Sequence, residues 1–185
     1  MDARELLTTR RSVRRFEQKP VSQELLAEIV ELARYAPSGG NFQPWEIIAV
    51  DEPETAEQVY ATLAWLPAEG QPPEDQKPVA YLVVISDEEA GVSDCASLTT
   101  YICLAAHERG LGSCWFGSVR RTELADDLAV PEKYSIEFVV ALGYPSRQSV
   151  AYDSDETTDV TVEDGTVSVP KRTVDALLHH NAYGE

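Results

Sequence analysis

The sequence predicts an α+β fold, in which helices and strands alternate irregularly around one sheet. Two observations lead to this prediction. Short apolar runs rich in β-branched residues occur between segments with helical spacing, and turns rich in proline and glycine separate them. The 185 residues contain no internal repeat and no long low-complexity tract. Since this length suits one sizeable core, we expect residues 1–185 to form a single domain.

The first half of the chain begins with helices and reaches a buried strand. Ser22 has the side chain of a helix N-cap, and Val21 and Leu26 are placed as a hydrophobic staple across it. Pro37 ends that helix, and the proline-rich stretch 67–78 reads as a loop. The expected elements are helices at 2–10, 22–35 and 53–66, and strands at 47–50 and 81–86.

The second half contains the most apolar helix of the chain, which Gly110 should close at its C-terminus. Valines alternate with polar residues on both sides of Asp164-Gly165, a pattern typical of a β-hairpin. The expected elements are helices at 94–109, 122–128 and 173–180, and strands at 113–116 and 136–142, with a hairpin at 160–169.

The charge of the chain restricts its partners. A formal charge of −17, from 32 acids against 15 bases, argues against nucleic acid or an anionic membrane as a partner. Only four of the bases are lysines, and an acidic, lysine-poor composition is typical of proteins from a high-salt cytoplasm, where salt screens self-repulsion. An ordinary acidic protein is the alternative.

Other classes of function have little support in the sequence. No apolar run approaches the ~20 residues that span a bilayer, and the N-terminus reads directly into a charged helix, so we expect a cytoplasmic protein. Three cysteines without metal-like spacing suggest buried thiols rather than disulfides or a catalytic thiol. The adjacent His179 and His180 point apart on a helix, so no metal site is expected.

An island of positive charge stands out against this acidic background. Residues 1–20 hold six basic and three acidic side chains, with Arg10-Arg11-Ser12-Val13-Arg14-Arg15 at the centre. The planar fork of arginine suits phosphate particularly well. The alternative is that these arginines pair with acids elsewhere in the chain.

Five segments together resemble the FMN-dependent nitroreductase family, in the order in which the family has them. They are Arg10-Arg11-Ser12-Val13-Arg14, Ala36–Trp45 (APSGGNFQPW), Arg109–Gly117 (RGLGSCWFG), Ala141–Pro145 (ALGYP) and Val169–Arg172 (VPKR). Each is short, but the five extend over essentially the whole chain. The resemblance implies a central, mostly antiparallel sheet flanked by helices, in an intertwined homodimer.

The resemblance also implies which residues hold FMN. Arg10, Arg14 and Arg172 are candidates for its phosphate, and Lys171 for a share of it. Arg11 and Ser12 would contact the pyrimidine edge and the ribityl chain. Arg15 is not included, because a solvated or salt-bridged surface arginine is an equally good interpretation.

Two further segments would surround the flavin ring. Pro37, Ser38 and Asn41 would reach the flavin bound mainly by the other subunit, so that the homodimer shares its sites. The backbone near Phe116 and Gly117 would face N5 of the ring, where a donor favours the reduced flavin. Trp45 and Trp115 are expected in the core instead.

The middle of the chain departs from the family pattern. Many relatives have an asparagine and a lysine that contact the flavin, where this chain has Glu74-Asp75-Gln76-Lys77. Gln76 or Lys77 could replace them.

The family reaction would use no Rossmann fingerprint, and none is present. NADH or NADPH would give hydride to N5 and leave, and a small flat aromatic acceptor such as a nitroaromatic or quinone would then take the electrons, in a ping-pong mechanism. Alternatives are a flavin-binding or storage protein, or a specialised reductive dehalogenase, flavin-fragmenting or azoline-oxidising enzyme. The short loop 67–78 counts against the inserted lid of dehalogenases.

Overall fold

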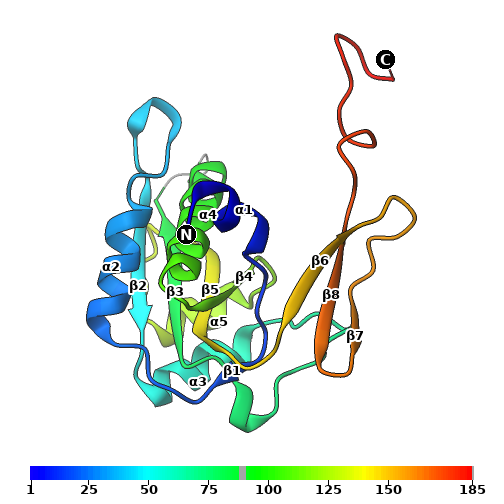
Figure 1. Cartoon of the computed structure of the whole chain (residues 1–185). Coiled ribbons are helices and arrows are strands. Elements are labelled where there is room, and N and C mark those ends of the chain that lie inside the picture. Colours follow the sequence, from blue (N-terminus) through cyan, green and yellow to red (C-terminus); the bar gives the residue numbers. More distant parts are fainter. Residues whose placement is uncertain (88–90, 185) are drawn as a thin grey trace.

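The computed structural model describes residues 1–87 and 91–184. These residues form a body built around one sheet, and beside it a small second sheet from which the chain runs outward to its C-terminus (Figure 1). Within these residues, no helix has the length and apolar character needed to cross a bilayer.

The central sheet confirms the predicted, mostly antiparallel α+β architecture. Strand β5 (Ser135–Pro145) pairs antiparallel with β3 (Ala80–Ser86) on one side and with β4 (Gly112–Phe116) on the other. Strand β2 (Trp45–Val50) forms the edge beyond β3, and the two-residue β1 (Phe16–Glu17) pairs with the end of β5. Because β5 lies between β3 and β4, β2 and β4 are at opposite edges of the sheet.

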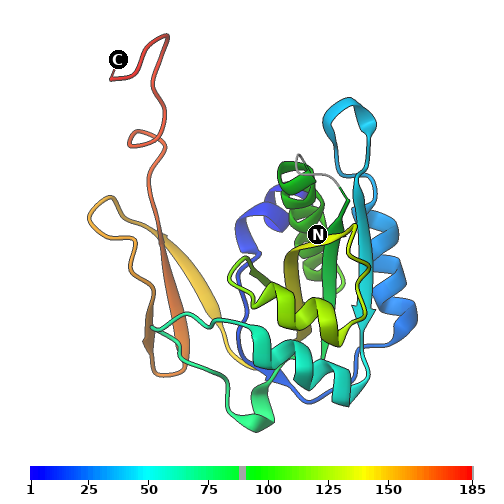
Figure 2. The ribbon, with the colours of Figure 1, turned by 180° about the vertical axis from the view of Figure 1, so that it is seen from behind.

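Helices cover both faces of this sheet (Figures 1 and 2). Those on one face are α2 (Gln23–Ala33) and α4 (Gly91–Glu108), with α1 (Ala3–Thr9) against α4; those on the other are α3 (Pro53–Thr62) and α5 (Arg121–Asp127). Strand β3 is therefore buried on both faces. Leu82 belongs to the core under α2 and α4, and Val83 belongs to the core under α3 and α5. A strand buried on both faces reads as a continuous apolar run.

The ends of the helices follow the expected capping chemistry. The hydroxyl of Ser22 accepts a hydrogen bond from the Leu25 amide at 3.2 Å. Gly110 ends α4 with a φ of +79°, in the left-handed region that glycine adopts without steric cost. The helix that we expected to reach residue 66 stops at Thr62, because Leu63 turns into extended backbone and bridges to Val119.

The second sheet confirms one prediction, and the segment that follows it corrects another. Strands β7 (Thr161–Glu163) and β8 (Thr166–Lys171) form the expected hairpin, and β6 (Ser149–Asp153) adds to β8 in parallel. The helix predicted at 173–180 is wrong: the chain there makes turns and bends. A segment this short is marginal as a helix, and Leu177 and Leu178 remain exposed without a core to pack on.

Candidate cofactor site

The basic island is held against the edge strand β4. The amide of Val13 donates to the carbonyl of Ser113 at 2.9 Å, and Ser12 forms a parallel bridge with Ser113. A methyl group at position 112 would lie 2.8 Å from three side-chain atoms of Val13, so glycine is what lets the two segments approach. Two segments separated by 100 residues thus meet at one site.

A cavity of about 410 Å³ opens where these segments meet α4 and β5. It brings together three residues expected at the site, Arg10, Ser12 and Gly117. An added side chain at Gly117 would meet nothing within 4 Å, so the backbone there is open to the cavity. The full lining is Arg10, Ser12, Thr100, Cys103, Trp115, Gly117 and Phe138.

Trp115 is a correction, because we expected it in the core. It is 39% exposed, and its ring stands edge-on to Phe138 with the centroids 4.9 Å apart. Strand alternation explains this: Cys114 and Phe116 on either side of it point inward and are buried. Phe116 packs against Trp65, so only its backbone is available for the role predicted from the sequence. Trp115 and Phe138 give the cavity an aromatic wall.

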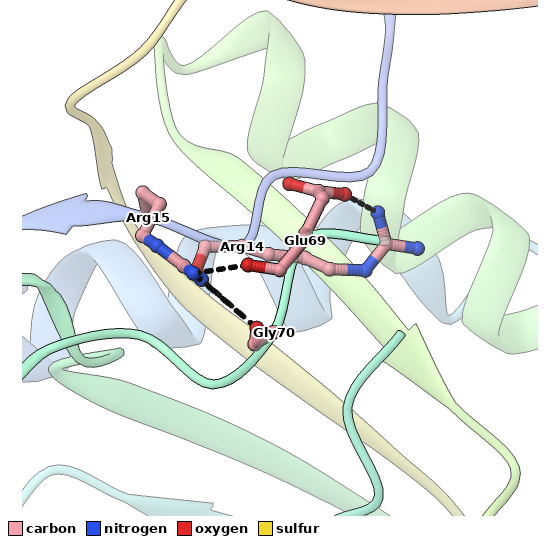
Figure 3. Close-up of polar contacts among 4 residues, drawn as sticks. All are labelled: Arg14, Arg15, Glu69 and Gly70. Carbon is pink, nitrogen blue, oxygen red and sulfur yellow. Dashed lines mark hydrogen bonds and ion pairs between the residues drawn. The ribbon is translucent and has the colours of Figure 1, made fainter. Parts of the chain in front are cut away.

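Arg14 and Arg15 are held by a single loop, as Figure 3 shows. The guanidinium of Arg14 pairs with the carboxylate of Glu69, whose side chain is only 2% exposed. Arg15 is 5% exposed and donates to the carbonyls of Glu69 (2.5 Å), Gly70 (3.3 Å) and Gln71 (2.9 Å). The interpretation of Arg15 as a surface arginine is therefore wrong. For Arg14, the structure contains the alternative that the sequence left open, an ion pair with an acid elsewhere in the chain.

The loop with Pro37, Ser38 and Asn41 precedes β2, at the opposite edge of the sheet from β4. It has its own internal order: the amide of Gly39 donates to Asp94 at 3.0 Å, and the amide of Gln43 to the Ser38 hydroxyl at 3.1 Å. Phe42 at its tip is 76% exposed. Within one chain, this loop does not line the cavity of Arg10 and Gly117.

Lys171 and Arg172 also lie outside that cavity. Lys171 is the last residue of strand β8 and Arg172 follows it, on the part of the chain that projects from the body (Figure 1). The Arg172 guanidinium donates to the carbonyl of Ala176. Lys77 lies outside that cavity too. Its ammonium is 2.9 Å from the carboxylate of Glu57 and 2.7 Å from that of Glu74. Lys77 lines a separate cavity from that of Arg10 and Ser12.

The cysteines at and beside the cavity are not nucleophiles. Cys103, which lines the cavity, is 3% exposed, and burial raises the pKa of its thiol. Cys114 is 2% exposed, and burial raises the pKa of its thiol to about 12. A thiol that stays protonated at neutral pH is unreactive.

Sequence reasoning missed Thr100 and Phe138, which line this cavity, and Arg147, which lines an adjoining cavity with Arg10 and Arg11. The first two sit in segments whose apolar patterns predict core, so nothing in the sequence marks them. Arg147 lies two residues after Pro145, and a basic residue just beyond a family segment is a signal that could have identified it.

Comparisons with known proteins identify the family of this chain. The model of the Nitroreductase family matches residues 7–89 and 84–144. A protein of Archaeoglobus fulgidus provisionally named NADH dehydrogenase/NAD(P)H nitroreductase is 33% identical over 162 residues, covering 82% of this chain and 90% of its own. The structure of an FMN-dependent nitroreductase from Clostridium difficile superimposes with a TM-score of 0.68 at 28% identity, covering 82% of this chain and 92% of that one.

An iodotyrosine deiodinase of Thermotoga neapolitana is more distant, at 25% identity over 175 residues, 82% of this chain and 93% of its own. The fold and these matches define an oxidoreductase. The chain belongs to the nitroreductase family, and it is an FMN-dependent oxidoreductase.

The residues at the site fit FMN. Two buried donor atoms, Arg11 Nε and the Ser149 hydroxyl, have no hydrogen-bond partner among the described residues, and both residues line an adjoining cavity that Arg10 also borders. Buried polar groups are normally paired, so donors left open at one place indicate a polar ligand. The aromatic wall and the open backbone at Gly117 suit a flat ring.

Proposed function

We propose that the protein carries electrons from NADH or NADPH to a small flat aromatic acceptor, a nitroaromatic or a quinone, with FMN as its cofactor. The observation that supports this most directly is the single cavity that Arg10, Ser12, Gly117 and the aromatic wall share. Bound FMN supplies the hydride chemistry there. The protein itself binds FMN, orients the nicotinamide or acceptor against it, and shields the site from water.

Each lining group has a distinct task in this proposal. Ser12, which lines the cavity, and Arg11, which borders the adjoining one, bond the polar edge of the ring and the ribityl chain. The backbone at Phe116 and Gly117 places an N–H toward N5. Trp115 and Phe138 present an apolar wall on which a nicotinamide or a flat acceptor stacks. Because donor and acceptor use the same cavity in turn, the kinetics are expected to be ping-pong.

The loop that could supply a lid is held in place by hydrogen bonds. In the loop between Leu66 and Pro78, the carbonyls of Glu69, Gly70 and Gln71 are bonded to Arg15. A loop tied down in this way is a poor lid. This favours an open site for varied flat acceptors over a dehalogenase that encloses one substrate.

We also propose that two copies of the single-domain chain complete each site. The projecting C-terminal segment carries Val174, Leu177 and Leu178 at 68%, 57% and 54% exposure, and apolar side chains in such a row need cover. Packing on a second copy would cover them. It would also allow Lys171 and Arg172, and the loop with Pro37, Ser38 and Asn41, to contribute to the flavin of that copy.

The decisive experiment is an anaerobic visible spectrum of the purified protein, before and after NADH and then NADPH. Flavin bands that bleach with a nicotinamide and return with a quinone or nitroaromatic are the expected result. Flavin that binds without bleaching would favour a flavin-binding or storage role instead. Absence of flavin binding, even with added FMN, would refute the proposal.

The homodimer has its own test. Sedimentation equilibrium in molar KCl should report a dimer, because we propose a cytoplasmic enzyme of a high-salt cell. Leu178→Asp should shift the equilibrium toward monomer and weaken FMN binding. Glu156→Gln, at an exposed position between β6 and β7, should change neither. A monomeric parent protein that binds FMN tightly would refute the shared site.

A further inference from the structure

The backbone amide of Gly117 is open where it borders the cavity of Arg10. Strand β4 ends at Phe116, which pairs with Val139 of β5, and Gly117 is the first residue beyond that ladder. In the part of the chain that the structure describes, the Gly117 N–H donates to no carbonyl. This N–H is therefore available to a ring bound in the cavity.

A donor on a glycine needs a restraint, because glycine has more backbone freedom than any other residue. The segment after Gly117 is held by the end of α3. The amide of Ala64 donates to the carbonyl of Ser118 at 3.1 Å, and the amide of Arg120 donates to the carbonyl of Thr62 at 3.0 Å. Neither bond holds the carbonyl of Gly117 itself.

Arg121 supplies that restraint. Its Nη2 donates to the carbonyl of Gly117 at 2.9 Å and to that of Glu137 at 3.1 Å, and its Nε donates to the carbonyl of Ile136 at 2.8 Å. The planar guanidinium holds these donors in a fixed fork. One side chain thus joins the residue beyond β4 to the neighbouring strand β5.

The two carbonyls on β5 lie at an irregularity of the sheet. The pairing of β5 with β3 shifts register between Phe138 and Ile136, which leaves Glu137 as the extra residue of a β-bulge. Bulges are frequent beside active sites, where they redirect side chains. The next residue, Phe138, belongs to the aromatic wall of the cavity. Arg121 therefore ties the open amide and the aromatic wall to one fixed point.

The placement of Arg121 does not serve its own helix. Arg121 is the first residue of α5, where the helix dipole disfavours a positive charge. The adjacent Arg120 pairs with Glu123, whereas Arg121 forms no ion pair among the described residues. In a chain with 32 acids against 15 bases, an arginine that bonds only carbonyls is best explained by what those carbonyls need.

We propose that Arg121 is a positioning residue of the flavin site. By holding the Gly117 carbonyl against the bulge of β5, it aims the Gly117 N–H at N5 of the bound ring. This inference rests on the proposed FMN-dependent function. A donor at N5 assists the atom that receives the hydride, and it is most effective when its direction is fixed before the reaction.

The test compares FMN with 5-deaza-FMN, in which a C–H group replaces N5 and cannot accept a hydrogen bond. Fluorescence titration of the apoprotein should show that Arg121→Met weakens FMN binding about 2- to 10-fold, as expected for one net hydrogen bond, and leaves 5-deaza-FMN binding unchanged. In the FMN-loaded variant, anaerobic bleaching by a saturating nicotinamide should be about 10- to 100-fold slower than in the parent, with an unchanged KM for that nicotinamide.

Two further variants separate the bonds of Arg121 from its charge. Arg121→Lys keeps the charge but cannot span three carbonyls, so it should also weaken FMN binding without affecting 5-deaza-FMN. It carries the same comparison if Arg121→Met does not fold. Arg120→Met, at the adjacent exposed position, removes the same charge and only the pair with Glu123, so both affinities and the bleaching rate should stay as in the parent.

Other outcomes overturn the inference in distinguishable ways. If Arg121→Met weakens FMN and 5-deaza-FMN equally, Arg121 supports the fold of the site and does not aim the amide. If Arg121→Lys has the full bleaching rate and FMN affinity of the parent, the charge matters and the three bonds do not. If Arg121→Met binds FMN and bleaches as the parent does, the Gly117 amide needs no restraint. If the parent protein binds neither flavin, the proposed function itself fails.

Discussion

Arg15 should matter for folding rather than for flavin binding. Its guanidinium bonds three successive carbonyls of the loop after α3, and no other hydrogen bond to these three carbonyls occurs among the described residues. Arg15→Met keeps most of the aliphatic stem and removes only the donors. At about 1 kcal/mol net for each carbonyl that loses its partner, the free energy of unfolding should fall by about 3 kcal/mol.

The assay is urea unfolding followed by tryptophan fluorescence, at one protein concentration and in molar KCl, because association with a second copy would change the apparent stability. Arg34→Met removes an exposed arginine paired with Glu31 and should have no measurable effect. Since Arg15 bonds carbonyls rather than carboxylates, the decrease in the free energy of unfolding should persist at high salt. A decrease below about 1 kcal/mol would refute the view that Arg15 clamps the loop.

Three further predictions follow from single features. Gly112→Ala, whose methyl would collide with Val13, should lower the free energy of unfolding by about 1–3 kcal/mol. Gly117→Ala should leave the Tm unchanged and weaken FMN binding, because its methyl enters the cavity. Equal losses of stability in the two variants would contradict this prediction. The buried thiols Cys95 and Cys114, with pKa values raised from 9.0 to about 11 and about 12, should not react with a thiol reagent at pH 8 until the protein unfolds. Because a raised pKa means that the unfolded state loses its protons first, their contribution to stability is complete below about pH 9 and is lost as the pH rises toward 12; stability that increases over this range would contradict the assignment. Finally, the net charge of −17 predicts that the Tm rises with KCl into the molar range, and a maximum at low salt would refute the high-salt origin.

Most of the core elements were predictable because their signals are local. Ser22 caps α2 through its own hydroxyl, Gly110 ends α4 by its own φ, and Asp164-Gly165 turns its own hairpin. The apolar run of β3 likewise identifies a strand with both faces covered. The segment 173–180 misled the prediction because its spacing is helical, while whether a short helix persists depends on a surface to pack against.

The site was predictable only as a set of candidate residues. The sequence by itself determined that a basic island lies in an acidic chain, that Gly112 and Gly117 flank a short strand, and that five segments match one family in order. It could not say which arginines meet an acid. Tertiary structure alone decided that Glu69 pairs with Arg14, that Arg15 is buried on a loop, and that Arg147 joins Arg10 and Arg11 around one cavity. The physical reason is range: caps and turns are decided within a few residues, whereas the partner of a charge is chosen by whichever distant segment the packed sheet brings beside it.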